Sequence, residues 1–114
     1  MASEEAESLI DRLSNPFYAL DAEWRLVRVN KEAERLWAMR RDDLIGRNIW
    51  SVFPQAVGSE PWKAHYRALA EHREVRVTAH SPVLRAPVEV CIQPLGDGLT
   101  VYFRRRQEER AASR

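Results

Sequence analysis

The segment Asn30–Pro54, NKEAERLWAMRRDDLIGRNIWSVFP, decides how the rest of the chain is interpreted. Asn30 is a good N-cap, and Ala33, Leu36 and Trp37 follow at the i, i+3 and i+4 spacing of one short apolar helix face. The segment then contains a tight acidic turn that ends in glycine and a compact apolar stretch that proline stops. This pattern predicts several short helical pieces around bulky side chains, a wall suited to enclosing a small interior.

Alternation of apolar and polar residues predicts strands on both sides of this wall. A further helix is expected from Glu60 to about His72, with Ser59 as its N-cap, and 55–60 is expected to be a loop. Pro82 and Pro87 should bracket one hairpin loop. Short connections favour antiparallel pairing, so the order of elements predicts an α+β domain. The expected strands are 17–21, 25–29, 74–81, 88–93 and 99–104, with a turn at 96–98 between the last two.

Both ends of the chain differ in pattern from its centre. Residues 3–13 have the spacing of an amphipathic helix, which is too short to be stable alone and should therefore pack on a surface. The tail 105–114 is highly charged and is either solvated or the start of a further helix. The apolar stripe that makes the first segment a candidate dimer interface consists of Ala6, Leu9, Ile10 and Leu13.

The motifs of the central segment resemble those of a PAS domain. An aspartate and a turn precede Leu-x-x-Val-Asn at 26–30, followed by Asp-Asp-Leu-Ile-Gly-Arg at 42–47 and Trp-x-x-Phe-Pro at 50–54, and 94–104 resembles the family's final hairpin. The resemblance covers about residues 15–104. It implies a core over 15–104 with one five-stranded antiparallel sheet in the order 2-1-5-4-3 and short helices on one face, preceded by an N-terminal amphipathic helix over 1–14 and followed by the tail at 105–114.

Composition excludes several classes of protein. A chain of 114 residues forms one domain, and a formal net charge of +1 argues against a nucleic-acid binder. The single cysteine, Cys91, excludes an internal disulfide and a cysteine-based zinc site. The sequence lacks a long apolar run and a signal-peptide pattern, so we expect a cytoplasmic protein that does not interact with a membrane.

The histidines and carboxylates do not form an evident catalytic or metal site. His65 and His72 are seven positions apart, which separates them by roughly 10 Å along a helix, too far for one metal ion. In the resembling family, haem-binding members use a histidine on this helix, where our alignment places Ser59. Flavin-binding photosensors use a cysteine after the Gly-x-Asn turn, where this chain has Ile49. We therefore expect neither haem nor flavin, and we do not expect an enzyme.

The bulky residues of the wall are the candidates for a ligand pocket. Their indole and phenol groups could contact a small molecule, or they could fill the interior completely. The pocket candidates are Leu36, Trp37, Trp50, Phe53, Trp62, His65, Tyr66, Leu69, Val77 and Cys91.

Together these features predict a non-enzymatic sensory and interaction module of a signal-transduction system. The resemblance implies that the module acts by homo- or hetero-dimerisation and conformational signalling, with a histidine kinase or another output partner. A homodimer is the first candidate, formed by the N-terminal stripe together with Thr100 and Tyr102 on the outer face of the sheet. The alternative is a sensor in which a small molecule or cofactor occupies the pocket and dimerisation is incidental.

Overall fold

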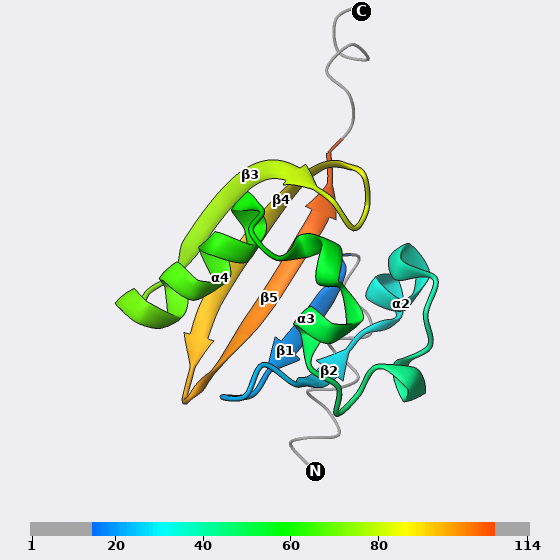
Figure 1. The fold of residues 1–114 in the computed structure, drawn as a ribbon, viewed down its shortest axis with the longest axis horizontal. Helices are drawn as coiled ribbons and strands as arrows, with labels where there is room; N and C mark the ends of the chain where they lie inside the picture. Colours follow the sequence, from blue (N-terminus) through cyan, green and yellow to red (C-terminus); the bar gives the residue numbers. More distant parts are fainter. Residues whose placement is uncertain (1–14, 107–114) are drawn as a thin grey trace, which may run out of the picture.

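The structure, a computed structural model, describes residues 15–106 and contains one antiparallel sheet of five strands in the order β2-β1-β5-β4-β3. This confirms the predicted α+β architecture and strand order (Figure 1). The predicted N-terminal helix over 1–14 and most of the predicted tail lie outside the described residues. The elements are β1 Phe17–Leu20, β2 Leu26–Val29, α2 Lys31–Trp37, η1 Arg41–Asp43, α3 Ile49–Val52, η2 Pro54–Ala56, α4 Glu60–Glu71, β3 Val75–Ser81, β4 Ala86–Leu95 and β5 Gly98–Arg105.

The buried residue Asn30 begins α2 and ties it to the sheet. Its side-chain oxygen accepts hydrogen bonds from the backbone N–H of Ala33, at 3.0 Å, and of Phe17, at 2.9 Å, while its amide donates to the carbonyl of Asn15. One side chain thus satisfies a free N–H of the helix and an N–H of β1, which confirms the predicted N-cap.

The helix α4 also begins as predicted, because Ser59 accepts a hydrogen bond from the backbone N–H of Trp62. It ends at Glu71, one residue earlier than expected, since His72 adopts a left-handed conformation with φ 53°. The tight turn ends at Gly46, whose φ of 90° lies in the left-handed region that favours glycine.

Two connections differ from their predicted forms. The stretch expected as a loop begins with the 3-10 turn η2, in which Pro54 takes a first-turn position where its missing N–H costs nothing. The hairpin loop between β3 and β4 is shorter than expected, because Pro87 lies inside β4 opposite His80. The loop therefore occupies 82–85, and its last residue, Arg85, has φ 58°.

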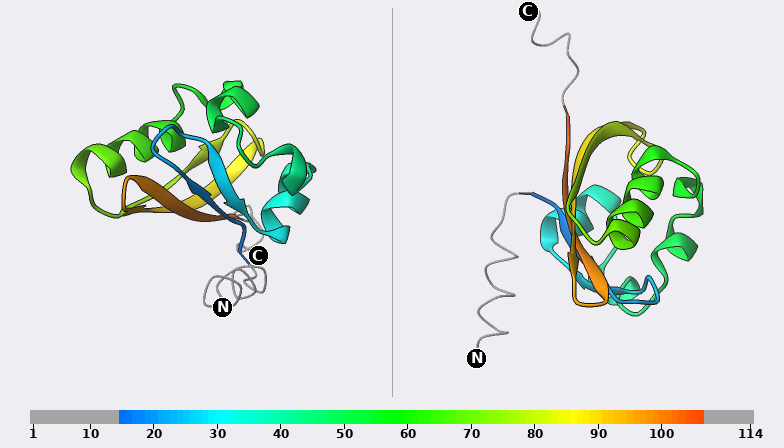
Figure 2. Two further views of the ribbon diagram at one scale, coloured as in Figure 1. Left: turned by 90° about the horizontal axis from the view of Figure 1, so that it is seen from below. Right: turned by 90° about the vertical axis from the view of Figure 1, so that its left-hand side faces the viewer.

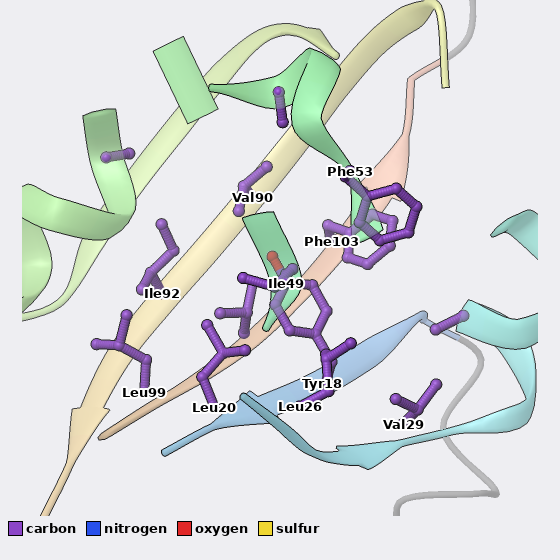
Figure 3. Close-up of a cluster of buried hydrophobic side chains, with 14 of the residues drawn as sticks. Tyr18, Leu20, Leu26, Val29, Ile49, Phe53, Val90, Ile92, Leu99 and Phe103 are labelled. Atoms are coloured by element: carbon purple, nitrogen blue, oxygen red, sulfur yellow. The ribbon is translucent and has the colours of Figure 1, made fainter. Parts of the chain in front are cut away.

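The helices α3 and α4 lie against one face of the sheet, which we call the inner face (Figure 2). Alternate residues of the central strands point into the space between this face and the helices, and Figure 3 shows Tyr18, Val90 and Phe103 directed into it beside Ile49 and Phe53. Among residues 15–106, the helices are too short or too polar to span a membrane.

The start of β5 packs tightly against β1. A Cβ atom at Gly98 would lie 2.0 Å from the carbonyl oxygen of Leu20, so only glycine allows the two backbones this approach. β1 lies between β2 and β5 in the sheet and pairs with both of them. A change at β1 can therefore affect strands on either side.

Candidate functional site

A cavity of about 60 Å³ lies between the inner face of the sheet and the helical wall. The wall side is formed by α3, η2 and the first turns of α4, and the loop between β3 and β4 closes one side. Aromatic rings dominate the lining, and its polar groups come from a tyrosine, a histidine, two serines and the indoles. The lining residues are Tyr18, Trp37, Ile49, Trp50, Phe53, Ala56, Ser59, Pro61, Trp62, His65, Ser81, Pro82, Val83, Leu84, Val88, Val90 and Phe103.

A buried hydrogen bond between Tyr18 and His65 joins the sheet to the wall. The Tyr18 hydroxyl lies 2.6 Å from Nε2 of His65, and Nδ1 of the same ring lies 2.6 Å from the carbonyl oxygen of Pro61. A carbonyl can only accept, so in the neutral ring Nδ1 carries the proton and Nε2 is the acceptor. The hydroxyl of Tyr18 therefore donates to Nε2, and both ring nitrogens are occupied.

Burial keeps both members of this pair uncharged. It lowers the pKa of His65 to about 4, although the hydrogen bond to Pro61 acts in the opposite direction. Burial also raises the pKa of Tyr18 far above its ordinary value. At neutral pH the pair is consequently an imidazole and a phenol, each in its neutral form.

Trp50 stands at the centre of an aromatic cluster that extends from the cavity to the surface. Its ring centroid lies 5.3 Å from that of His65 and 5.7 Å from that of Trp24, and it also contacts the rings of Trp62 and Tyr66. Its Nε1 is the one buried side-chain nitrogen or oxygen within residues 15–106 that has no hydrogen-bond partner. Such an atom is uncommon in a folded protein and needs an explanation.

Half of the predicted pocket residues line this cavity, namely Trp37, Trp50, Phe53, Trp62 and His65. Tyr66 lies on the outside of α4, where its ring packs at a tilt against Trp24 with ring centroids 4.4 Å apart and remains partly exposed. The other predicted residues on the helices and on β3 pack against the core without lining the cavity; these are Leu36, Leu69 and Val77.

Cys91 lies on the opposite side of the sheet, which we call the outer face, because it alternates with the cavity residue Val90 along β4. Its thiol donates a hydrogen bond to Glu74, 3.2 Å away. Burial and this carboxylate raise the pKa of the thiol, which disfavours the reactive thiolate. Thr100 and Tyr102, the predicted interface residues of β5, lie on this face too, half-buried and exposed respectively.

The sequence analysis did not identify Tyr18, or residues 81–84 at the end of β3 and in the following loop, as parts of the site. The signal for Tyr18 was present, because it alternates with Leu20 and so shares the face of a buried residue. The loop gave no comparable signal, since its position over the cavity depends on how the hairpin of β3 and β4 curves around α4 (Figure 1).

The described residues contain no cluster suited to a metal ion. Within residues 15–106, no group of three or more histidine, cysteine, aspartate or glutamate side chains is close enough to hold one. Asp42 and Asp43 are exposed in η1, away from the cavity. Any ligand of this site would be bound by aromatic surface and hydrogen bonds.

Comparison with known proteins identifies the family. The chain matches the PAS fold family over residues 10–111, and it belongs to that family. A search of curated proteins found no significant match to this chain.

Solved structures show the same fold at low sequence identity. The PAS domain of BvgS from Bordetella pertussis has a TM-score of 0.76 at 20% identity, over 96% of this chain and 90% of that one. The photoactive yellow protein domain of the sensor histidine kinase Ppr from Rhodospirillum centenum has a TM-score of 0.71 at 20% identity, over 87% and 92%. The LOV protein of Rhodobacter sphaeroides has a TM-score of 0.70 at 18% identity, over 94% and 68%.

Proposed function

We propose that the chain is a non-enzymatic sensory and interaction module of a signal-transduction system. A ligand or partner would bias the position of α3 and α4 on the sheet, and the sheet would carry the change to an output partner. Membership of the PAS family supports this proposal, and so does the likeness to a domain of a sensor histidine kinase. A histidine kinase is accordingly our first candidate for the output partner.

The observation that carries the proposal is the hydrogen bond between Tyr18 and His65. It connects α4 with β1, and β1 pairs with the strands on both of its sides. A shift of α4 must either break this bond, which leaves a buried acceptor unpaired, or move β1 with it. Under this proposal the wall and the sheet have two arrangements, one with this hydrogen bond and one without it, and a sensor requires such alternatives.

The same pair argues against catalysis. Both ring nitrogens of His65 have partners, and the proton of Tyr18 is already donated. Burial lowers the pKa of His65 to about 4 and raises the pKa of Tyr18, so at neutral pH His65 is a weak base and Tyr18 keeps its proton. The cavity thus offers binding surface without a reactive group.

Haem and flavin do not suit this cavity. Pockets for ligands of that size measure roughly 300–1,000 Å³, far above the 60 Å³ found here. Haem propionates or a flavin phosphate would also need cationic partners, and the lining residues contain no lysine or arginine. We therefore expect a signal other than these cofactors.

We further propose that two copies of the chain associate through the outer face of the sheet. Tyr102 offers an aromatic side chain that is 37% exposed there, and Thr100 lies beside it on β5. The apolar stripe of the N-terminal segment would contribute to the same interface, as its sequence pattern suggests; it consists of Ala6, Leu9, Ile10 and Leu13.

Hydrogen exchange of the variant Tyr18→Phe tests the coupling between wall and sheet. We expect faster amide exchange in α4 and also in those parts of β2 or β5 that do not pair with residue 18. Tyr66→Phe is the matched control, because it removes a hydroxyl from the outer side of α4 and should change no distant strand. Changes confined to the neighbours of residue 18 would refute the coupling.

Light scattering tests the dimer separately. The wild-type chain should show twice the monomer mass, and Leu9→Asp or Tyr102→Asp should lower it towards that of a monomer. Val57→Asp places the same charge at an exposed position near the wall and should leave the mass unchanged. An unchanged mass for both interface variants would contradict this mode of association.

A second function, a sensor with an occupied cavity, is favoured by the aromatic lining of the cavity. Native mass spectrometry beside the denatured mass distinguishes the two functions. Extra mass that disappears on denaturation would indicate an occupied cavity, whereas a doubled mass without addition would favour the interaction module.

A further inference from the structure

The turn between β1 and β2 holds a tryptophan in a backbone conformation that favours glycine. The N–H of Asp21 donates to the carbonyl of Arg25 at 3.0 Å and closes the loop 22–24, and the N–H of Trp24 donates back to the carbonyl of Asp21. Trp24, the last residue of the loop, has φ 66°. Loops of this form usually carry glycine at the left-handed position, and a bulky residue there is an outlier.

This conformation strains the backbone of Trp24. A left-handed residue with a Cβ atom is disfavoured roughly tenfold relative to the ordinary regions. Within residues 15–106, three other non-glycine residues have a positive φ, and two of them, Ala38 and His72, end helices, where the conformation is common. Trp24 does not end a helix, so other contacts must hold it in place.

The side chain of Trp24 packs on the helical wall. Its ring centroid lies 4.4 Å from that of Tyr66 on α4 and 5.7 Å from that of Trp50 on α3. Aromatic pairs at such separations attract each other beyond the area that they bury. The contacts of the ring with two wall helices therefore offset the strain of the backbone that presents it.

The backbone of the same turn is bonded to the start of α3. The carbonyl of Trp24 accepts a hydrogen bond of 2.8 Å from the N–H of Ile49, the first residue of α3. The carbonyl of Glu23 accepts one of 3.2 Å from the side chain of Asn48. An N–H in the first turn of a helix has no partner within that helix, so the turn supplies one. Movement of the wall away from the turn would break these bonds and the ring contacts together, and it would release the backbone of Trp24.

We propose that Trp24 is a positioning residue that sets the balance between the two arrangements of the wall. Its ring contacts favour the arrangement described here, and its strained backbone favours the one in which the wall has moved. Because these contributions oppose each other, the two arrangements differ little in free energy. A ligand or partner then needs only a modest differential affinity to shift the wall. This inference rests on the proposed sensory function and names what regulates its site.

Alanine and glycine at position 24 separate the ring from the strain. Trp24→Ala and Trp24→Gly both remove the ring, but only glycine also relieves the left-handed backbone. Native-state hydrogen exchange of the full-length chain, followed by NMR, reports opening of the turn at the Ile49 amide and opening of the wall at the amides of α4. Tyr66→Leu removes the ring contact from the α4 side and leaves the turn unchanged, so the test does not depend on the folding of a variant at position 24.

We expect Trp24→Ala to accelerate exchange at Ile49 and in α4, because it loses the ring contacts and keeps the strain. Exchange at both places should be roughly fivefold slower in Trp24→Gly than in Trp24→Ala. Relief of the strain slows opening about tenfold, and the greater freedom of glycine in the opened turn reverses about twofold of this. Tyr66→Leu should also accelerate exchange at Ile49, although this amide is bonded to the turn and not to α4.

Two controls identify the origin of the difference. Ala22→Gly introduces glycine in the same loop at a position without a positive φ, and it should accelerate exchange at Ile49 about twofold. Ala38→Gly relieves a comparable left-handed residue, with φ 56°, at the end of α2. It should raise the urea midpoint of unfolding without slowing the local opening at Ile49.

Three outcomes would overturn the inference. Equal exchange in Trp24→Ala and Trp24→Gly would show that the turn stores no strain. Acceleration at Ile49 without any in α4 would show that the turn does not act on the wall. No acceleration in Trp24→Ala or in Tyr66→Leu would show that the rings do not hold the wall. Failure of the proposed sensory function looks different, since the strands would then not respond to Tyr18→Phe, whatever the exchange at Ile49.

Discussion

The two faces of the central sheet are made by alternate residues of the same strands, yet their chemistry is opposite. The inner face of β4 and β5 contributes Val90, Ile92 and Val101, all buried. The outer face carries the ion pair of Arg104 and Glu89, whose side chains are 62% and 34% exposed. Neutral, buried contacts therefore hold the wall to the sheet, whereas the other side of β4 and β5 combines a partly exposed ion pair with the buried Cys91.

This difference predicts which face of the sheet contributes most to stability and to signalling. A buried group has few alternatives to its native partner, so its loss is costly. An exposed ion pair exchanges its partner for water at little cost. Substitutions on the inner face should thus have large effects, and equivalent substitutions on the outer face should have small ones.

The largest effect is expected for Ile92→Ala. Ile92 is completely buried and lies opposite Val75 and Val101, so its truncation should reduce the free energy of unfolding by roughly 2–5 kcal/mol. Gln93→Ala, one residue along on the exposed side, should stay within about 0.5 kcal/mol of the wild type. Urea denaturation measures the free energy of unfolding of both variants. Equal losses of stability would contradict the expected difference between the inner and the outer face.

Acidification should have the next largest effect. Folding lowers the pKa of His65 from 6.5 to about 4, so below pH 6.5 the unfolded chain binds a proton that the folded chain does not. The free energy of unfolding should accordingly fall as the pH falls from 6.5 to 4, with a loss of about 2 kcal/mol by pH 5. The stability is fully present above this window.

The variant His65→Gln should lose most of this dependence, although it will be less stable at neutral pH. His80→Gln, at an exposed position of β3, should keep the wild-type dependence. Urea denaturation at about pH 7 and about pH 5 compares the three proteins. If the free energy of unfolding of His65→Gln depends on pH as strongly as that of the wild type, another titratable group causes the effect.

A smaller loss is expected for Tyr18→Phe. The substitution leaves Nε2 of His65 buried without a donor, which should cost roughly 1–2 kcal/mol. Tyr66→Phe removes a hydroxyl from a tyrosine that is 39% exposed and should change the stability by less than about 0.5 kcal/mol. Thermal denaturation followed by circular dichroism distinguishes the two variants. Similar melting temperatures would show that the hydrogen bond between Tyr18 and His65 contributes little to stability.

The smallest effect is expected at the outer-face ion pair. Arg104 and Glu89 approach to 2.9 Å, but the Arg104 side chain is 62% exposed. A double-mutant cycle of Arg104→Ala and Glu89→Ala should give a coupling of roughly 0.2–1 kcal/mol that decreases at high salt. A larger coupling that salt does not screen would show that this face is less open to water than its exposure indicates.

Local patterns predicted much of this fold because they depend on neighbouring residues. Asn30 and Ser59 are caps wherever a helix follows them, and Gly46 permits the positive φ that its turn requires. Strand alternation separated the two sides of β4 and β5 correctly. The strand order was derived from the resemblance to the PAS family, and that resemblance was recognised from sequence motifs.

The candidate site was only partly accessible to the same reasoning. Alternation shows that Cys91 and Val90 point to opposite faces, but it does not show which face encloses a cavity. Helical spacing places Tyr66 and His65 on one helix, but their surroundings differ because Trp24 covers the first and Tyr18 meets the second. These neighbours are distant along the chain.

The sequence by itself determined the helix starts, the turns, the strand alternation and the family, because these follow from interactions between residues a few positions apart. Only the tertiary structure decided that Tyr18 meets His65 across 47 positions and that the Nε1 of Trp50 has no partner. The physical reason is that a hydrogen bond between distant segments depends on how the sheet twists and how the wall packs on it. No local spacing encodes that geometry.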